Sequence, residues 1–251
     1  MSSPSAPNHT LVNGLRVLER LASVTEGCSV SALAAELGLP KSHAHRLLRT
    51  LLDAGYVAQS ADTHEYRSDY RLLALAGPFA EGMLLRVQGG PVLRALSEAT
   101  HGGAYLAVVH RGEPLIVMSD LYRGQSSPHA LGLGQRLSRH ASAFGKLFLA
   151  LNRLAYRDDE LTRFTAATIT SRHALDEELV EIRRRGYSIN RRENGPVHSF
   201  AAPIRAATGE LLGAIGIALD PSLVVRRGEA SCIEVLLRAS EQLESRLAGT
   251  V

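Results

Sequence analysis

The chain of 251 residues has no tryptophan, only two cysteines and no long apolar run. The isolated Cys28 and Cys232 belong to no motif, so they indicate neither a disulfide framework nor a Cys-x-x-Cys metal site. No apolar segment approaches the roughly 20 residues that a membrane-spanning helix needs. The Ser- and Pro-rich start, MSSPSAPNHT, lacks the apolar region of a signal peptide. We therefore expect a cytoplasmic protein.

A strong excess of charge of either sign is also missing. The formal net charge is +3, which only weakly favours an anionic partner. Within residues 1–75, seven Lys and Arg are balanced by seven Asp and Glu. Any surface in this region that binds an anion must therefore be local. The hydrophobic content of 45% over 251 residues is enough for one large or two modest domains with real cores.

Sequence motifs typical of enzymes are missing as well. Gly145-Lys146 would end a phosphate-binding P-loop, but that motif needs Gly at position 140 and Ser or Thr at position 147, where His140 and Leu147 stand. The Gly-Leu-Gly at 132–134 lies outside a strand-to-helix context, and no Gly-x-Ser-x-Gly elbow occurs. These absences argue against an enzyme.

The ten histidines show no metal-ligand spacing. His43 and His45 are two residues apart on a predicted helix and therefore lie on different faces. We expect the other histidines to lie at scattered positions. Four of them could nevertheless converge in three dimensions: His129, His140, His173 and His198. We expect no metal and no cofactor.

The most informative stretch, residues 29–68, reads SVSALAAELGLPKSHAHRLLRTLLDAGYVAQSADTHEYRS. Ser31 is a candidate N-cap for a first short helix, whose apolar residues share one face. Gly38 suits the left-handed position after a helix, and Pro40 suits the opening of the next helix. The spacing predicts two helices joined by a tight turn.

The second helix, from Lys41 to about Ala54, has one apolar face and one polar, cationic face. A short cationic face of this kind fits the major groove of DNA, whereas a charged helix face can equally be a solvated surface. A β-hairpin is predicted after Gly55, from the β-prone runs 56–58 and 66–67 around a turn at 61–64. Together, the second helix and this wing supply the candidate DNA-contacting residues Lys41, Ser42, His43, His45, Arg46, Arg49, His64 and Arg67.

The string LAAELGLPKSHAHRLLRTLLDAGYV closely resembles the IclR family of bacterial transcription regulators, whose recognition segment usually reads Gly-Leu-Pro-Lys-Ser-Thr-Val-His-Arg-Leu-Leu. His43 and Ala44 stand where Thr and Val are usual, which implies a different sequence preference at that contact. RHASAFGKLFLA, EIRRRGYSINRREN and FAAPIRAATGELLGAIGIALDP resemble the family's effector-binding domain in order and spacing. The resemblance covers residues 11–247. It implies a repressor or activator that binds a palindromic double-stranded operator as a homodimer or tetramer.

The whole chain is predicted to be α+β. We expect a disordered tail (1–10), a winged helix-turn-helix domain (11–68), a linker helix (69–88) and an effector-binding and oligomerisation domain (89–251). A helix break is predicted at Gly77-Pro78, because proline disfavours helix at the residue before it. Beyond residue 103, hairpins with interspersed helices indicate an antiparallel sheet, and the resemblance likens this domain to a GAF-type sensor.

The resemblance also implies a pocket for a small effector. A helix start at Ser142 suits a carboxylate, because free backbone N–H groups and the positive end of the helix dipole point at it. Asn190 stands where Asp is frequent and Phe200 where Cys is common, while Gly216 and Ala218 replace the Ser of members that bind small keto acids. The pocket has thus lost hydroxyls and gained rings, which favours an apolar or aromatic acid; alternatively, the rings fill the cavity. The implied effector-binding residues are Ser142, Ala143, Phe144, Asn190, His198, Phe200, Gly216 and Ala218.

Two functional hypotheses follow from these observations. The first is a DNA-binding transcriptional regulator whose operator binding is modulated by a small carboxylate metabolite. The rival is a small-molecule enzyme or metal-binding sensor whose winged helices only mediate protein contacts. Ligand turnover, or stoichiometric tightly bound metal in the purified protein, would favour the rival.

Overall fold

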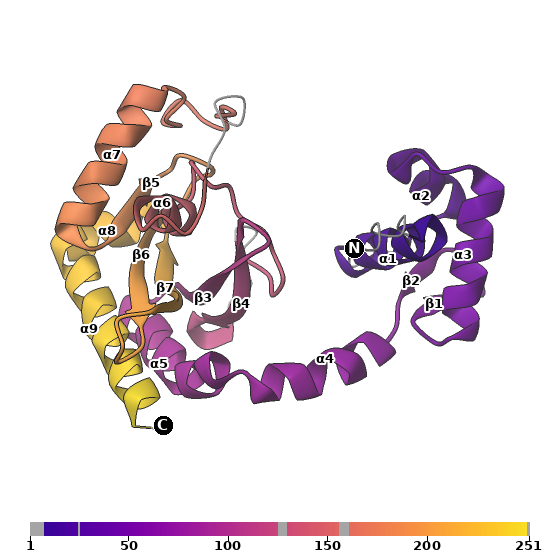
Figure 1. Cartoon of the computed structure of the whole chain (residues 1–251), viewed down its shortest axis with the longest axis horizontal. Helices are drawn as coiled ribbons and strands as arrows, with labels where there is room; N and C mark the ends of the chain where they lie inside the picture. Colours follow the sequence, from indigo (N-terminus) through magenta and orange to yellow (C-terminus); the bar gives the residue numbers. More distant parts are fainter. Residues whose placement is uncertain (1–7, 25, 125–129, 156–160, 250–251) are drawn as a thin grey trace, which may run out of the picture. The chain divides into compact units, whose positions relative to one another are not determined.

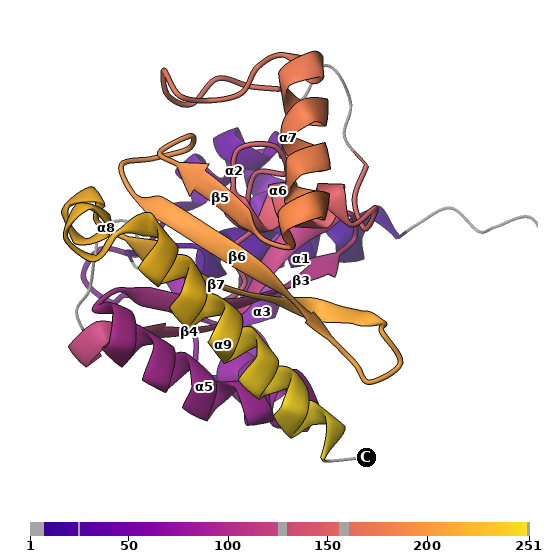
Figure 2. The same ribbon diagram turned by 90° about the vertical axis from the view of Figure 1, so that its left-hand side faces the viewer.

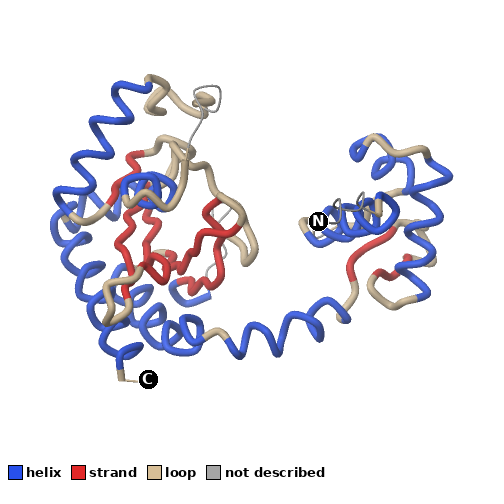
Figure 3. The backbone as a smooth tube through the Cα atoms, viewed as in Figure 1, coloured by secondary structure: helices blue, strands red, loops and turns tan. Residues whose placement is uncertain are grey.

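The computed structural model describes residues 8–24, 26–124, 130–155 and 161–249. The chain forms two compact units, Met1–Gly82 and Met83–Val251. Figure 3 shows that the first unit is mainly helical with a short pair of strands, whereas the second contains the larger sheet. Most of the predicted disordered tail, residues 1–7, lies outside the described residues. The first helix begins at His9, so the last two residues of the predicted tail, 9 and 10, belong to the helix.

The first unit is the predicted winged helix-turn-helix. Helices α1 and α2 pack on α3, and an antiparallel hairpin follows (Figure 1). Val17, Leu21, Leu33, Leu48 and Tyr66 are buried in its core. Its elements are α1 (His9–Ala22), α2 (Val30–Leu37), α3 (Lys41–Asp53), β1 (Val57–Gln59), β2 (Tyr66–Ser68) and α4 (Arg71–Gly82).

The turn between α2 and α3 follows the predicted chemistry with small shifts. The N-cap of α2 is Ser29 rather than Ser31, because the Ser29 hydroxyl accepts a hydrogen bond from the Ala32 backbone N–H at 3.2 Å. Gly38 adopts the left-handed conformation, with φ of 65°, and ends α2 as expected. Pro40 precedes α3 instead of opening it.

The predicted helix break at Gly77-Pro78 is wrong. Helix α4 continues through Pro78 to Gly82, and the interruption comes at Met83, whose backbone is extended. A proline inside a helix removes one backbone hydrogen bond. Since no residue of α4 is buried within its unit, water can reach the carbonyl that loses its partner, which lowers the cost of continuing.

The second unit is built on a five-stranded antiparallel sheet in the order β4-β3-β7-β6-β5. The α+β class and the antiparallel sheet are therefore confirmed. The elements are α5 (Leu84–Thr100), β3 (Gly103–His110), β4 (Glu113–Leu121), η1 (Tyr122–Gly124), α6 (Ala143–Ala150), α7 (Arg172–Arg185), β5 (Ser188–Arg191), β6 (His198–Arg205), β7 (Leu211–Leu219), α8 (Pro221–Arg227) and α9 (Glu229–Ala248).

The two faces of this sheet carry different layers. Helices α5 and α9 cover one face and α6 and α7 the other (Figure 2). Side chains alternate between the faces along each strand, so Phe200 packs with the α5/α9 core while its neighbour Ala201 packs with the α6/α7 core. Ala201 pairs with Gly216 and Ser199 with Ala218, and these four residues share the α6 face.

Candidate DNA-binding and effector-binding sites

The polar face of α3 is exposed and cationic. The apolar face of the helix is buried through Ala44, Leu47 and Leu48. No carboxylate in the described part of the chain pairs with the cations of this face, and the helix has no acidic residue before Asp53. The charge is therefore available to an external anion. The exposed candidates are Lys41, Ser42, His45, Arg46 and Arg49, with His64 and Arg67 on the wing.

His43 and Ala44, the two departures from the family's recognition segment, face opposite environments. Ala44 is completely buried in the core of the first unit, so it cannot contact DNA. His43 is half-buried on the polar side, and its Nδ1 lies 3.1 Å from an Arg46 guanidinium nitrogen. Of these two departures, only His43 therefore changes the polar face of α3, and it lies beside Arg46.

The wing is fixed to the core by a third short segment. Cys28 and Tyr66 exchange two backbone hydrogen bonds, each of 2.9 Å, and the Tyr66 ring is buried. His64 precedes β2 with a φ of 57°, a left-handed conformation that is uncommon outside glycine. The hairpin thus holds Arg67 on a strand and His64 at its turn, both exposed.

In the second unit, the Ala-Ser-x-x-Gly-Lys segment builds the start of α6. The Ser142 hydroxyl donates to the Ser138 carbonyl oxygen at 2.6 Å and accepts from the Gly145 backbone N–H at 2.9 Å. A Cβ on Gly145 would lie 2.2 Å from that same carbonyl oxygen, so only glycine permits this close approach. Ser142 therefore caps α6, and Gly145 lets the helix pack against the preceding loop.

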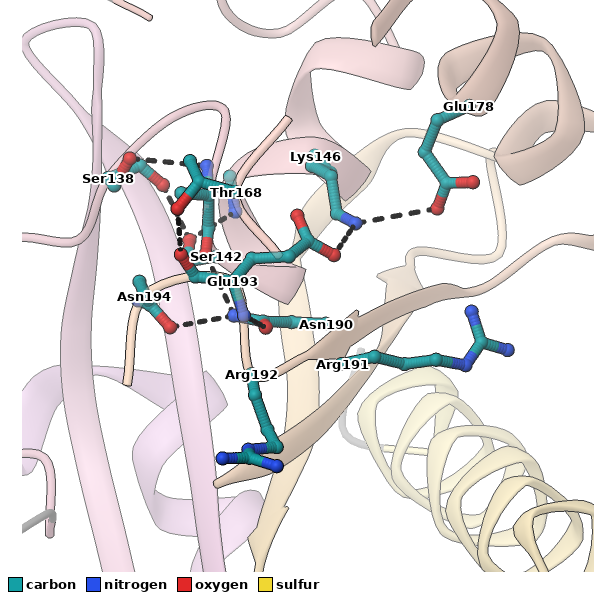
Figure 4. Close-up of polar contacts among 12 residues, drawn as sticks. Ser138, Ser142, Lys146, Thr168, Glu178, Asn190, Arg191, Arg192, Glu193 and Asn194 are labelled. Carbon is teal, nitrogen blue, oxygen red and sulfur yellow. Dashed lines mark hydrogen bonds and ion pairs between the residues drawn. The ribbon is translucent and has the colours of Figure 1, made fainter. Parts of the chain in front are cut away.

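Lys146 of the same segment is buried, with 1% of its side chain exposed. Its ammonium lies 2.5 Å from one Glu193 carboxylate oxygen and 3.5 Å from Glu178 (Figure 4). Glu178 also accepts a hydrogen bond from Arg185 at 2.8 Å. Lys146 thus ties α6 to α7 and to the segment after β5, a buried arrangement in which losing one partner leaves an uncompensated charge.

Asn190 organises the wall beside this ion pair. Its amide donates to the Ala141 carbonyl at 2.8 Å and to the Asn194 side chain at 2.7 Å, while its oxygen accepts from the Glu193 backbone N–H at 2.7 Å. An aspartate could not supply the two donated bonds. The sequence analysis expected Asn190 to bind the effector. In the structure its hydrogen-bonding groups are already engaged by the protein, so it supports the wall.

A small cavity of about 40 Å³ lies between the start of α6 and the sheet. None of the described side chains that line it is charged, and their polar groups are hydroxyls and one amide. Because the first turn of a helix has N–H groups without an intrahelical partner, the start of α6 offers neutral donors at this cavity. The lining residues are Tyr105, Leu131, Leu137, Ser142, Ala143, Phe144, Asn194, Val197, Ser199, Ile217 and Ala218.

Tyr105 and Ser199 are lining residues that the sequence analysis missed. The Tyr105 phenol is buried and accepts a hydrogen bond from the Leu131 N–H at 3.4 Å. Burial raises its pKa above the ordinary tyrosine value, so the group is neutral and retains a proton to donate. Alternation along β3 places Tyr105 and Ala107 on one face of the sheet, but nothing in the sequence pattern says which face holds the cavity.

His198 and Phe200 require a correction, because they lie on the opposite face of the sheet from the cavity. Phe200 is completely buried in the α5/α9 core. His198 lies two residues before Phe200 on β6, so its side chain is on the same face of the sheet. Burial lowers the pKa of His198, and its Nδ1 has no hydrogen-bond partner among the described residues. The residue of β6 that reaches the cavity is Ser199. Phe144 and Gly216 do meet on the α6 face, where the Phe144 ring covers the glycine.

The described residues contain no group of three His, Cys, Asp or Glu side chains placed to hold a metal ion. His129, one of the histidines considered above, lies outside them. Nor does any helix of the described ranges have the length and apolar character needed to cross a bilayer.

Family profiles match most of the chain. Residues 10–61 match the IclR helix-turn-helix domain, and residues 80–245 match the bacterial transcriptional regulator IclR C-terminal domain. Among relatives, the DNA-binding transcriptional repressor YiaJ of Escherichia coli is 27% identical over 98% of this chain and 90% of its own length. The HTH-type transcriptional regulator BhcR of Paracoccus denitrificans is 29% identical over 94% of this chain and 88% of its own.

Solved structures agree with these matches. An IclR transcriptional regulator from Alicyclobacillus acidocaldarius shares the fold with a TM-score of 0.82 at 20% identity, covering 97% of this chain and 100% of its own. An IclR homologue from Microbacterium hydrocarbonoxydans, solved as a complex with 4-hydroxybenzoate, has a TM-score of 0.78 at 25% identity, covering 95% of this chain and 98% of its own. Both domains, in this order, identify the chain as a member of the IclR family of bacterial transcriptional regulators.

Proposed function

We propose that this regulator binds a palindromic operator as a homodimer through α3 and the wing, and that a small monocarboxylate in the α6 cavity modulates this binding. The main support for the DNA-binding part of this proposal is the cationic face of α3. Lys41, Arg46 and Arg49 have no intramolecular carboxylate partner within the described ranges. Arginine and lysine on such a face meet guanine acceptors or phosphate oxygens in the major groove.

Exposed apolar residues support the homodimer. Leu11 and Leu15 of α1 are 62% and 51% exposed, and Leu73 and Phe79 of α4 are 69% and 73% exposed. Leu11 and Leu15 are one helical turn apart on α1 and so lie on one face, and exposed apolar patches are typical of interaction surfaces. A second copy of the chain would bury them and would present two recognition helices to a palindrome; tetramers are the alternative assembly. Sedimentation equilibrium distinguishes the two assemblies, and a monomer at micromolar concentration would contradict both.

The effector class rests on the start of α6 and on the uncharged cavity. Helix N–H groups and hydroxyls can bind one carboxylate without a cation, whereas a second carboxylate inside the same cavity would be buried without a partner among its lining residues. The relative solved with 4-hydroxybenzoate supports a monocarboxylate here. Any such ligand modulates operator binding only if it binds two arrangements of the protein with different affinity.

DNA recognition is tested by selecting binding sites from a random duplex pool and measuring affinity by fluorescence anisotropy. We expect selected palindromes to bind the wild type at least a thousandfold more tightly than random DNA. Arg49→Ala should weaken binding, while Arg153→Ala in the second unit serves as a charge-matched control. Equal affinity for selected and random DNA would contradict operator reading.

The effector class is tested by a thermal-shift screen against aliphatic and aromatic mono- and dicarboxylic acids. A ligand that binds only the folded state raises the melting temperature. We expect stabilisation by monocarboxylates and none by dicarboxylates of similar size. Stabilisation by dicarboxylates alone would contradict the proposed class.

A further inference from the structure

The cavity at α6 is too small for the whole effector. At about 40 Å³ it falls far below the roughly 150 Å³ of an engineered protein cavity that holds benzene. Phe144 is the reason, because a Cβ placed on Gly216 would lie 2.6 Å from the tip of its ring. The ring therefore occupies the inner end of the cavity, directly over the glycine.

A wider pocket adjoins the cavity. Leu131, Leu137, Asn194 and Val197 line both spaces, and the outer pocket has a volume of about 430 Å³. That volume lies within the range of about 300–1,000 Å³ typical of small-molecule sites. The space for the body of a ligand is therefore on the outer side of these four residues.

The outer pocket has an apolar wall with an exposed aromatic ring. Phe164 lines it, is 51% exposed, and stacks on the buried His140 with ring centroids 5.8 Å apart. Leu131, Pro196 and Val197 add further apolar surface. When an apolar ligand covers an exposed phenylalanine ring, apolar surface is removed from water, which favours binding.

We infer that the effector is an elongated monocarboxylate, whose carboxylate sits at the start of α6 and whose apolar body extends past Leu137 and Val197 to cover Phe164. Phe144 excludes compact aromatic acids by closing the inner end over Gly216. This inference rests on the proposed effector site and names the shape of ligand that the site accepts. The relevant comparison is between a ring attached directly to the carboxylate and a ring separated from it by a spacer.

The test is a calorimetric titration of benzoate, phenylacetate, 3-phenylpropanoate and 4-phenylbutanoate into the full-length protein. We expect affinity to rise along the series by about fourfold for each methylene buried. Phe144→Ala should open the inner end and tighten benzoate binding at least tenfold. Leu179→Ala removes a buried side chain of the same core that does not line the cavity, and it should leave benzoate binding unchanged.

Phe144→Leu provides the same comparison with less loss of core volume, in case the alanine variant does not fold. If benzoate binds the wild type more tightly than 3-phenylpropanoate, the elongated shape is overturned while the proposed carboxylate site stands. If Leu179→Ala tightens benzoate binding as much as Phe144→Ala does, the role of Phe144 is overturned. If no monocarboxylate binds, the proposed effector class fails and this inference fails with it.

Discussion

In the proposed function, the exposed face of α3 and the start of α6 each bind an anion, but they do so by opposite means. The α3 face is exposed and carries Lys41, Arg46 and Arg49, so it suits a polyanion whose counterions are released on binding. The α6 start is buried, and none of the described side chains that line its cavity is charged. Lys146, the cation of α6 itself, is engaged by Glu193 and Glu178. Under the proposed function, the surface charge of α3 binds DNA, whereas the buried charge of Lys146 stabilises the wall beside the pocket.

The largest expected effect comes from breaking the buried charge at the pocket. Lys146→Met leaves Glu193 buried without its cation, and removing one member of a buried pair costs about 3–5 kcal/mol of folding free energy. Urea unfolding of the variant should show this loss. The matched control is Arg184→Met on α7, whose partner Glu181 is half-exposed; it should leave the urea midpoint nearly unchanged, because exposed ion pairs contribute little. Equal costs for the two variants would remove the distinction between buried and surface charge.

The next effect concerns the exposed charge of α3. If Arg46 contacts a base, Arg46→Ala should cost about 1–3 kcal/mol of operator binding and relax specificity at that base pair. The folding free energy should change little, because the side chain is exposed. Anisotropy titrations on the selected operator and on random DNA measure the loss of operator affinity and the loss of specificity. Equal weakening on the two DNAs would instead make Arg46 a phosphate contact.

Removing the cap of α6 should have an intermediate effect. Ser142→Ala deletes the hydroxyl that accepts from the Gly145 N–H, and loss of such a cap costs about 0.5–2 kcal/mol. Effector affinity should fall as well, because the first turn loses its fixed geometry, while operator affinity without effector should be unchanged. Ser171→Ala at the N-cap of α7 is the matched control: it should destabilise without changing effector affinity.

The smallest effect is a dependence of stability on pH at His198. Burial lowers its pKa below the ordinary histidine value, with the Arg191 and Arg192 charges acting in the same direction and Glu229 opposing them. The unfolded chain therefore binds more protons as the pH falls through about 6.5, and the native state loses stability there. His198→Gln should reduce the decrease in the free energy of unfolding that occurs as the pH falls from 7 to 5. An unchanged slope would show that other groups cause it.

Local chemistry explains which parts of the fold were predictable from sequence. Gly38 ends α2 through its left-handed conformation, and the hairpin predicted after Gly55 is present as β1 and β2. The break at Pro78 was mispredicted because a solvent-exposed helix tolerates the lost hydrogen bond. Predictions that depend on one residue's backbone chemistry thus succeed unless solvent replaces the missing partner.

The candidate site was predictable only in part, because its geometry depends on the faces of distant strands. The start of α6 carries its own signal in Ser142 and Gly145, whereas a shift of one residue moves a strand position from one face of the sheet to the other. This is why His198 and Phe200 were assigned to the pocket in place of Ser199. The closure of the inner cavity depends on a contact between Phe144 and Gly216, 72 positions apart in the numbering (216 − 144), which no local pattern reveals.

The most direct test of the account is a titration of the selected operator with and without a saturating monocarboxylate from the screen. A coupling free energy of about 1–3 kcal/mol, typical of allosteric regulators, predicts a shift in operator affinity of about 5–150-fold. Arg46→Ala should lower operator affinity in both conditions and keep the shift. Superimposable curves with and without a ligand that demonstrably binds would contradict the claim that the α6 cavity controls the α3 face.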